Sequence, residues 1–340
     1  MTAAGEGLRS ARDMLPAGAP RLGLGCGDLY AGEHEQASLR LLKTAFDSGV
    51  RYFDVARLYG DGQAEHVVGK AFRGVRDQLI IASKAGIVPW SMQLATRLQR
   101  KALSTARRLA PFAGGLIPEP PPAVERYGAF APAELVRSVE TSLKALRTDY
   151  LDILLLHECD VPQATRPETL NLLERLQAQG KVRAIGIATR FPETQGILAA
   201  EPERFAVAQF PSDVFSQHER RLPAWRGVPV THSIYKRGLE PLRQQVTSDP
   251  ARAAEWSRRF ARSADDVAGY AELLLQDALA SHDGLVLVTT SKPERIGPAV
   301  ETAPTCPSGW CARRSTRACA ISTWRGSMAT ARRKAWSAGR

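Results

Sequence analysis

Short apolar runs alternate with longer segments of helical spacing over most of this chain. Eight of the apolar runs have the length and composition of buried strands. They are Leu22–Gly25, Arg51–Asp54, Leu79–Ser83, Leu151–His157, Ala184–Ala188, Ala206–Phe210, Pro229–Ser233 and Gly284–Val288. Strands that alternate with helices indicate a parallel sheet, and eight strand–helix units predict a closed (β/α)8 barrel, or TIM barrel. We therefore expect an α/β fold with a single barrel domain over residues 1–301.

The intervening segments carry helix signals of two kinds. Glu35–Ser48 and Ala133–Leu146 each place apolar residues on one face at helical spacing. Pro167–Gln179 opens on a proline, which suits the first turn of a helix, and is followed by Gly180, which suits a helix end. These three segments are predicted helices between strands.

Two segments do not fit the repeat. Residues 85–132 separate the third strand from its helix, and so long a connection in a compact domain is typical of a lid or a binding loop. Residues 302–340 lack strand or helix periodicity and form an atypical basic tail that we expect to be poorly ordered. A change of translational reading frame near residue 302 would produce such a tail, and sequencing of the coding DNA tests that hypothesis.

The net positive charge of the chain suggests a nucleic-acid partner, but the distribution of that charge along the sequence argues against one. The net charge of the 340 residues is +11, but eight Lys or Arg and no Asp or Glu lie in residues 302–340, which leaves +3 for the rest. Most of the basicity thus belongs to the tail and not to a patch on the folded body. Binding of nucleic acid through the tail would require a salt-dependent affinity that disappears when residues 302–340 are removed. We expect no nucleic-acid partner.

The compartment follows from apolar runs and cysteines. No apolar run approaches the roughly 18 residues that a membrane helix needs, and the first residues lack the apolar stretch of a signal peptide. Only Cys26 and Cys159 precede the tail, too few for a disulfide framework. We expect a cytoplasmic protein without a membrane partner.

Several common site motifs are absent. Gly23–Asp28 begins like a dinucleotide-binding glycine loop but ends in Asp, and no helix opens there directly. The chain has no phosphate-binding P-loop motif and no G-x-S-x-G. The six histidines are scattered without the spacing of a metal site, so we expect no metal.

A stronger signal comes from polar residues at the ends of apolar strands. Asp54, Lys84 and His157 end or follow the second, third and fourth strands, and Tyr59 follows five residues after Asp54. Because the strand ends of a barrel meet at one mouth, these side chains are expected to converge. A partly desolvated Lys84 would pair with Asp54 and lower the pKa of Tyr59, making it a proton donor and acceptor.

Each of these residues also has an ordinary structural interpretation. A strand-end Asp is more often a helix cap or turn residue, and a single Tyr is more often a packing residue. Lys84 alone would be a surface charge, and His157 alone a satisfied polar residue of a loop. The four together at three successive strand ends favour a site.

The segments around these residues resemble a known family. Phe53–Gly60 (FDVARLYG), with Glu65 and Val68–Phe72 after it, closely resembles the first signature of the aldo-keto reductases. Ser142–Asp152 (SLKALRTDYLD) resembles the second signature, and Gly180–Gly186 (GKVRAIG) resembles the fifth strand. The resemblance covers roughly residues 20–300. It implies a barrel that binds NADP(H) and transfers hydride between nicotinamide and an aldehyde, ketone or sugar.

The resemblance also implies roles for individual residues. Asp54, Tyr59, Lys84 and His157 match the catalytic tetrad, in which Tyr59 protonates the carbonyl oxygen. Lys84, paired with Asp54, lowers its pKa, and His157 hydrogen-bonds the carbonyl. The residues implied to bind the cofactor are Gln209 at the carboxamide, Tyr235 against the ring, and Thr290 and Arg295 at the 2′-phosphate. We expect Trp90 or Tyr127 in the loop 85–132 to form an apolar wall for the small carbonyl, alcohol or sugar substrate.

The chain departs from the family pattern at two places. Ala188–Thr189 stands where the family has Ser-Asn, which rearranges or weakens the carboxamide contacts. The last barrel helix should begin near Pro293, but the recognisable chain stops near Glu301, so we expect this helix to be incomplete. Both departures leave open an alternative function: a non-catalytic protein that binds a ligand or cofactor on the same barrel.

Overall fold

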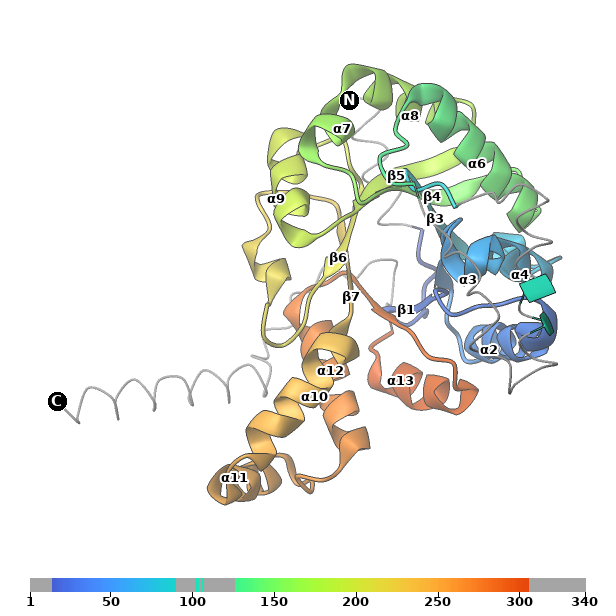
Figure 1. Cartoon of the computed structure of the whole chain (residues 1–340). Coiled ribbons are helices and arrows are strands. Elements are labelled where there is room, and N and C mark those ends of the chain that lie inside the picture. Colours follow the sequence, from blue (N-terminus) through green and yellow to red (C-terminus); the bar gives the residue numbers. More distant parts are fainter. Residues whose placement is uncertain (1–13, 90–101, 104, 107–125, 306–340) are drawn as a thin grey trace.

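The computed structural model describes residues 14–89, 102–103, 105–106 and 126–305, in which eight parallel strands close into a barrel in sequence order (Figure 1). The strands are β1 (Leu22–Gly25), β2 (Tyr52–Asp54), β3 (Ile80–Ala85), β4 (Leu151–His157), β5 (Val182–Ala188), β6 (Val207–Pro211), β7 (Val228–His232) and β8 (Leu285–Val288). The predicted (β/α)8 barrel is therefore confirmed. Closure is completed by β8 pairing with β1, where Leu287 lies opposite Gly23.

Helices surround the barrel and cover its outer face (Figure 1). The helices up to β7 are α2 (Glu35–Asp47), α3 (Tyr59–Gly62), α4 (Ala64–Ala71), α6 (Pro132–Leu146), α7 (Val161–Thr165), α8 (Pro167–Ala178) and α9 (Phe191–Ala200). After β7 come α10 (Ile234–Thr247), α11 (Pro250–Phe260), α12 (Val267–Ser281) and, after β8, α13 (Ile296–Thr302). Short 3-10 turns are η1 (Gly32–His34), η2 (Arg76–Gln78), η4 (His218–Arg221) and η5 (Pro293–Arg295). The three predicted helices correspond to α2, α6 and α8.

Side chains fill the barrel interior and leave no room for a side chain at some positions. Tyr52, Leu155 and Leu287 are buried there. A Cβ atom at Gly23 would lie 2.5 Å from Leu287 Cδ2 and 2.8 Å from Tyr52 Cδ1. A glycine is therefore needed in β1 because large side chains from the strands on either side occupy the space in front of it.

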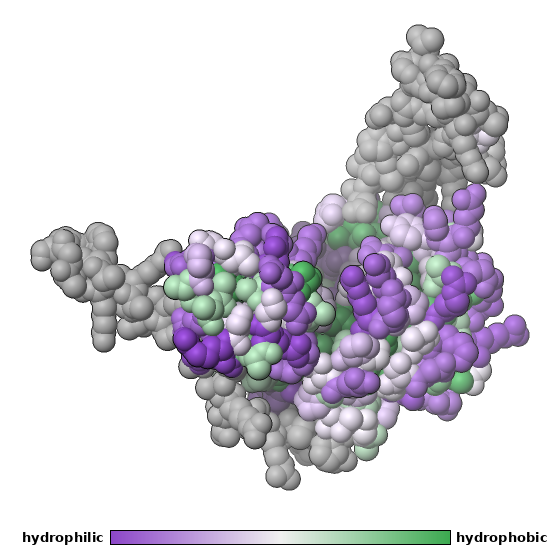
Figure 2. All heavy atoms as spheres, turned by 90° about the horizontal axis from the view of Figure 1, so that it is seen from below, coloured by the Kyte–Doolittle hydropathy of each residue, from purple (hydrophilic) through white to green (hydrophobic). Residues whose placement is uncertain are grey.

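The segment between β7 and β8 was not predicted from the sequence. Helices α10, α11 and α12 form a lobe that extends away from the barrel (Figure 1) and has its own small core. Trp256 of α11 is 1% exposed and stacks on Tyr270 of α12, with ring centroids 4.6 Å apart. Seen from below, hydrophobic residues gather in the hollow between this lobe and the rest of the molecule (Figure 2). In sequence, the lobe directly follows β7, and the end of β7 contributes to the barrel mouth.

The helix after β8 is short, in line with the expectation of an incomplete last helix. It has seven residues, of which Ile296 is buried. Its following segment packs back on the start of the chain, since Arg21 N donates to Pro304 O at 3.2 Å. Residues 306–340, most of the tail expected to be poorly ordered, lie outside the described residues. Among the described residues, no helix has the length and apolar character needed to span a membrane.

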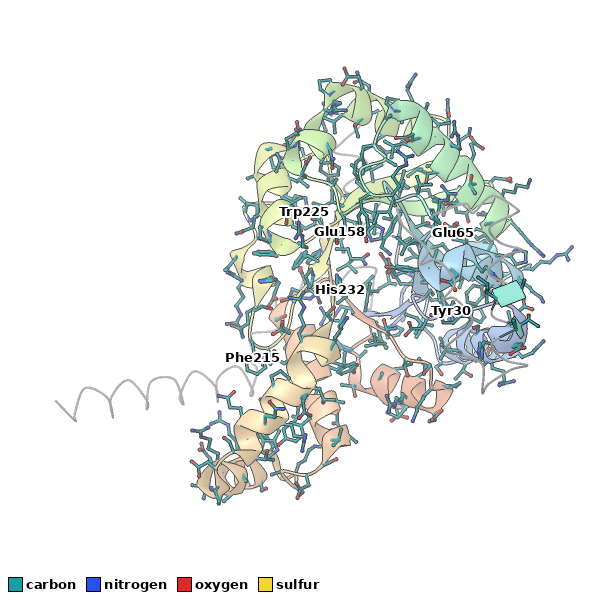
Figure 3. The ribbon with its side chains drawn as sticks, viewed as in Figure 1. Tyr30, Glu65, Glu158, Phe215, Trp225 and His232 are labelled. Atoms are coloured by element: carbon teal, nitrogen blue, oxygen red, sulfur yellow. The ribbon has the colours of Figure 1, made fainter. Side chains whose placement is uncertain are left out.

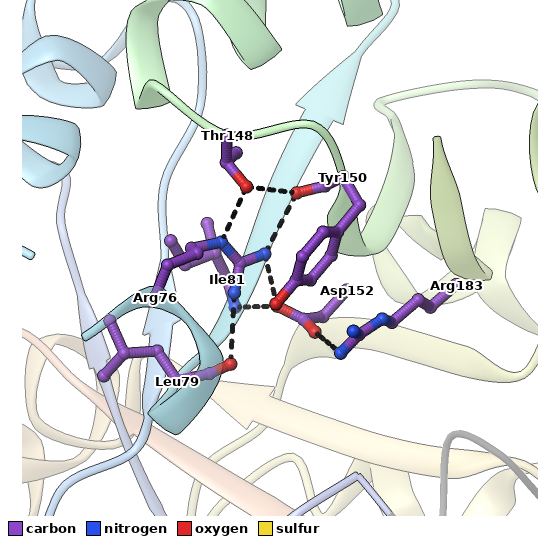
Figure 4. A network of polar contacts seen from close by, with 7 residues as sticks. All are labelled: Arg76, Leu79, Ile81, Thr148, Tyr150, Asp152 and Arg183. Atoms are coloured by element: carbon purple, nitrogen blue, oxygen red, sulfur yellow. Dashed lines mark hydrogen bonds and ion pairs between the residues drawn. The ribbon is translucent and has the colours of Figure 1, made fainter. Parts of the chain in front are cut away.

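An ion-pair network lies where β3, β4 and β5 begin, and Figure 4 shows its contacts. Asp152, the second residue of β4, accepts hydrogen bonds from the amide of Ile81 at 2.9 Å and from Arg183 at 3.0 Å. Arg76 pairs at 2.7 Å with Asp152 Oδ2, the oxygen that also accepts from Ile81, whereas Arg183 binds Oδ1, and both arginines stack on Tyr150. The buried carboxylate thus joins β3, β4 and β5 where these strands begin.

Removal of the charge of Asp152 should destabilise the fold without touching the barrel mouth. Breaking a buried ion pair from one side leaves the other charge uncompensated, so Asp152→Asn should lower the free energy of unfolding by about 3 kcal/mol. Urea denaturation followed by circular dichroism measures this. A change below about 0.5 kcal/mol would contradict the structural role of the network.

Candidate active site

Strand alternation places a set of polar side chains inside the barrel at its mouth. Successive residues of a strand point to opposite sides. Tyr52, Ile80 and Leu155 belong to the interior core, so residues two or four positions further along the same strands also point inward. These are Asp54 on β2, Lys84 on β3 and His157 on β4. The same reasoning takes Val207 to Gln209 on β6 and Val230 to His232 on β7.

Lys84 and Asp54 form a buried ion pair at the centre of this set. The ammonium Nζ lies 2.6 Å from Asp54 Oδ1, and the side chains are 1% and 4% exposed. Lys84 also donates to the carbonyl of Val55 at 3.2 Å. Burial lowers the pKa of Lys84, but Asp54 and Tyr59 oppose it, and the net direction is upward. Lys84 therefore stays cationic at neutral pH.

Tyr59 lies next to this ammonium group. It begins the short turn α3, and Lys84 Nζ lies 4.6 Å from its ring centroid. The turn needs glycine at the next position, since Gly60 has φ of 57° and a Cβ there would lie 1.8 Å from Leu29 O. The backbone carbonyl of Leu29 therefore fixes the direction in which the turn leaves Tyr59.

The pKa of Tyr59 differs from the sequence-based prediction. We predicted that Lys84 lowers it below its ordinary value. In the structure, burial raises the pKa of Tyr59, and the opposing effect of Lys84 is smaller. Tyr59 therefore carries its proton at neutral pH, as a proton donor must, and Lys84 lies where it stabilises the phenolate left after donation.

Two neutral histidines lie near this group, His157 on the neighbouring strand β4 and His232 on β7. His157 meets Tyr59 edge to face, with ring centroids 6.4 Å apart. Burial and the charge of Lys84 lower the pKa of His157 to about 3 and that of His232 to about 4. His232 was not predicted as a site residue. In the sequence, His232 is marked only by its position at the end of β7. That position indicates a site residue only when it is known which residues of β7 point inward; Figure 3 shows where His232 lies.

Gln209 completes the inner set from β6. It is 5% exposed and hydrogen-bonds the carboxylate of Asp54, which leaves its own Oε1 as a buried oxygen without a hydrogen-bond partner. Unsatisfied buried polar atoms are uncommon in folded proteins and call for an explanation. An amide hydrogen from a bound molecule would satisfy this oxygen.

The other predicted cofactor residues lie at the rim. Tyr235 of α10 is partly buried, and its pKa is raised to about 12 by burial against an opposing effect of Arg295. The charge of Arg295 is therefore near enough to Tyr235 to act on its hydroxyl. Thr290 Oγ1 accepts from the amide of Lys292 at 3.0 Å and so shapes the turn that leads into η5, while the side chain of Arg295 is exposed.

The structure shows the surroundings of Thr189, the residue after strand five at which the chain departs from the family pattern. The Thr189 hydroxyl is buried and lies 2.8 Å from the Thr194 hydroxyl of α9. It is therefore engaged within the protein at the position where the family has an amide side chain.

The described residues include only part of the 85–132 loop. Tyr127 lies near the end of the 85–132 connection and is 60% exposed, whereas Trp90 is outside the described residues. Within the part of the chain that the structure describes, no three His, Cys, Asp or Glu side chains are grouped to hold a metal ion.

Comparisons with known proteins identify the family of this chain. The sequence profile of the aldo/keto reductase family matches residues 21–300, so the chain belongs to that family. It is 32% identical over 225 residues to the aldo-keto reductase YhdN of Bacillus subtilis, covering 64% of this chain and 58% of the relative. It is 29% identical over 168 residues to the methylglyoxal reductase YeaE of Escherichia coli, covering 48% and 44%. The chain thus spans less than two thirds of these relatives.

Solved structures share the fold over more of the chain. An aldo-keto reductase from Klebsiella pneumoniae in complex with NADPH is 23% identical, with a TM-score of 0.59 over 84% of this chain and 85% of that one. A glycerol dehydrogenase from Gluconobacter oxydans is 19% identical, with a TM-score of 0.60 over 84% and 87%. At this identity the likeness shows the barrel fold alone.

The buried histidines predict how stability depends on pH. Burial lowers the pKa of His157 and His282 to about 3 and that of His232 to about 4, whereas their ordinary value is 6.5. Only the unfolded chain takes up these protons as the pH falls below 6.5. The contribution of these histidines to the free energy of unfolding should therefore be nearly constant well above pH 6.5 and fall between pH 6.5 and 4, by on the order of 1 kcal/mol for each histidine at pH 5.5.

His282 allows this to be tested outside the mouth. Its Nδ1 accepts from the Gly284 amide at 3.0 Å, so its Nε2 carries the proton and donates to Thr231 Oγ1 at 2.9 Å. His282→Gln should reduce the difference in unfolding free energy between pH 7.5 and 5.5 by about 1 kcal/mol, measured by urea titration. An unchanged difference would rule out the contribution of His282.

Proposed function

We propose that this protein is an NADP(H)-dependent oxidoreductase that transfers hydride between nicotinamide and a small carbonyl compound or the corresponding alcohol or sugar. The observation that carries the proposal is the grouping of the buried Lys84–Asp54 pair with the partly buried Tyr59 and His157 at one barrel mouth. Family membership supports it, as do the reductase activity in the name of one relative and the NADPH bound in one structural neighbour.

The residues present fit a nicotinamide cofactor. The unpartnered Oε1 of Gln209 would accept a hydrogen bond from the carboxamide amide group. His232, close to Lys84 and His157, is better placed than Tyr235 to face the nicotinamide ring, whereas Tyr235, Thr290 and Arg295 would bind the adenosine side and its 2′-phosphate. When bound, the cofactor supplies or accepts the hydride, which no side chain can do.

The protein's own part is to bind and orient the carbonyl group and to move one proton. Neutral His157 has ring nitrogens free of hydrogen bonds within the described chain and would hold the carbonyl oxygen beside Tyr59. The Tyr59 hydroxyl donates its proton to that oxygen as negative charge develops there. Lys84 stabilises the resulting phenolate, and Asp54 keeps Lys84 oriented and compensates its buried charge.

A non-catalytic binding protein on the same barrel is the alternative. The engaged Thr189 and the seven-residue α13 favour it, because both alter the surroundings of the cofactor site. The preserved Lys84–Asp54 pair favours the oxidoreductase, because a binding function alone gives no reason to hold a buried ammonium beside a tyrosine.

Replacement of Tyr59 by Phe tests the proposed chemistry. Tyr59→Phe removes the proton donor but leaves the ring in contact with Lys84. Steady-state turnover of NADPH with a panel of aldehydes and ketones should fall by on the order of 1000-fold. The Kd for NADPH should change less than about twofold, since the hydroxyl is assigned to the substrate. Unchanged turnover would refute the role of Tyr59.

Replacement of Arg295 by Gln tests the assigned phosphate end. The guanidinium would form a charge-assisted contact with the 2′-phosphate, which NADH lacks. The Kd for NADPH should rise about tenfold and the Kd for NADH less than about twofold, as measured by calorimetry. An equal effect on both nucleotides would assign Arg295 to another part of the cofactor or to structure.

A further inference from the structure

Lys84 has a neighbour in β3 that faces the opposite side of the barrel wall. Because strand residues alternate, Ser83 points outward, toward the helices, when Lys84 points inward. Ser83 is fully buried, and its hydroxyl donates to Glu65 Oε1 at 2.6 Å. Glu65 lies on the first turn of α4 and is on the helix side of the barrel wall, away from His232 (Figure 3).

Glu65 is a buried carboxylate held by two helices and a strand. It is 3% exposed, and Ser142 of α6 hydrogen-bonds it in addition to Ser83. Burial raises its pKa, while the two hydroxyls and the charge of Arg57 oppose this. A carboxylate in such a place costs free energy unless its surroundings satisfy it, and an apolar side chain would pack there without that cost.

Arg57 connects Glu65 to the segment that carries Tyr59. It lies two residues before Tyr59, between β2 and the turn α3, and is partly buried. Its Nη1 donates to Ser138 Oγ of α6 at 3.5 Å, and it is close enough to Glu65 for each charge to stabilise the other. Behind β3, Glu65 therefore contacts the neighbour of Lys84 on one side and faces the arginine near Tyr59 on the other.

We propose that Glu65 is a positioning residue for the reaction: by hydrogen-bonding Ser83 and attracting the nearby charge of Arg57 from outside the barrel, it sets the distance between Lys84 and the hydroxyl of Tyr59. The inference rests on the proposed oxidoreductase function. Lys84 and Asp54 join β3 and β2 from inside, while Glu65 acts from outside on β3 and on the segment that follows β2. Glu65 is separated from the mouth by β3 and touches neither substrate nor cofactor.

Glu65→Gln is the variant that separates charge from shape. Its amide oxygen still accepts from Ser83, but it offers no charge to Arg57, so the fold is retained while the hold on the Tyr59 segment loosens. Proton donation depends steeply on geometry, so kcat should fall about tenfold. KM for the carbonyl and Kd for NADPH should each stay within about twofold, because Glu65 contacts neither ligand.

Asp152→Asn is the matched control. It is the same chemical change in another buried acid of the barrel wall, placed at the far end of the strands and paired with two arginines. It should lower the melting temperature and leave kcat within about twofold. A kcat for Glu65→Gln no lower than that of wild type or of Asp152→Asn would overturn the proposal.

A double-mutant cycle with Arg57→Gln tests the connection. If Glu65 acts through Arg57, the double variant should lose no more kcat than the more impaired single variant. If the fold losses in kcat of the two single variants multiply in the double variant, the two residues act independently. That result would overturn the proposal that Glu65 acts through Arg57.

Amide hydrogen exchange gives a readout that needs no substrate. Exchange at residues 57–63 should be faster in Glu65→Gln than in wild type by more than at the other barrel segments, whereas in Asp152→Asn any acceleration at 57–63 should be no greater than at those segments. Unaltered exchange in Glu65→Gln would overturn the positioning role even if turnover fell. Failure of the wild-type protein to bind NADPH or reduce any carbonyl would instead refute the proposed function, and the exchange comparison would still decide whether Glu65 holds the turn.

Discussion

Lys84 and Asp54 face each other across 2.6 Å inside the barrel, almost completely out of contact with solvent. An ammonium group placed there alone would lose its proton or disrupt the fold, because burial of an unpaired charge is costly. Asp54 makes the charge tolerable, and the carboxylate is in turn oriented by Gln209. The remaining features of the mouth follow from that charge. Tyr59 lies against the Lys84 ammonium group, and the positive charge of that group helps to keep His157 and His232 neutral.

The barrel separates this chemistry from the interactions that stabilise the fold. The strand ends bring Asp54, Lys84, His157, Gln209 and His232 together from five strands that are far apart in sequence. The strand beginnings hold the Asp152 network, which joins three strands by ion pairs and stacking. Such a division is typical of (β/α)8 barrels, in which one face performs the chemistry and the other stabilises the barrel. The hydrogen bond between Glu65 and Ser83 links the two functions, since it is a structural contact made directly behind Lys84, a proposed catalytic residue.

Much of the fold and the inner site could be predicted because both depend on local pattern. The eight apolar runs identified every strand, and Lys84 and Asp54 were readable as polar residues where such runs end. The lobe of α10–α12 was missed because Trp256, Tyr270 and the residues around them form a separate small core that the strand–helix repeat does not predict, although Leu275 and Leu279 of α12 belong to the main core. His232 was missed because its inward direction follows from the register of β7 and not from its neighbours in sequence. The pKa of Tyr59 was mispredicted because the sequence shows the nearby Lys84 but not the depth of burial that outweighs it.

The barrel mouth is expected to receive a phosphorylated nicotinamide nucleotide. Titration of the purified wild-type protein with NADPH and, separately, with NADH, followed by tryptophan fluorescence, tests this without knowledge of the substrate. We expect a saturable change with NADPH and at least about tenfold weaker binding of NADH. The absence of a saturable change with either nucleotide would contradict this expectation.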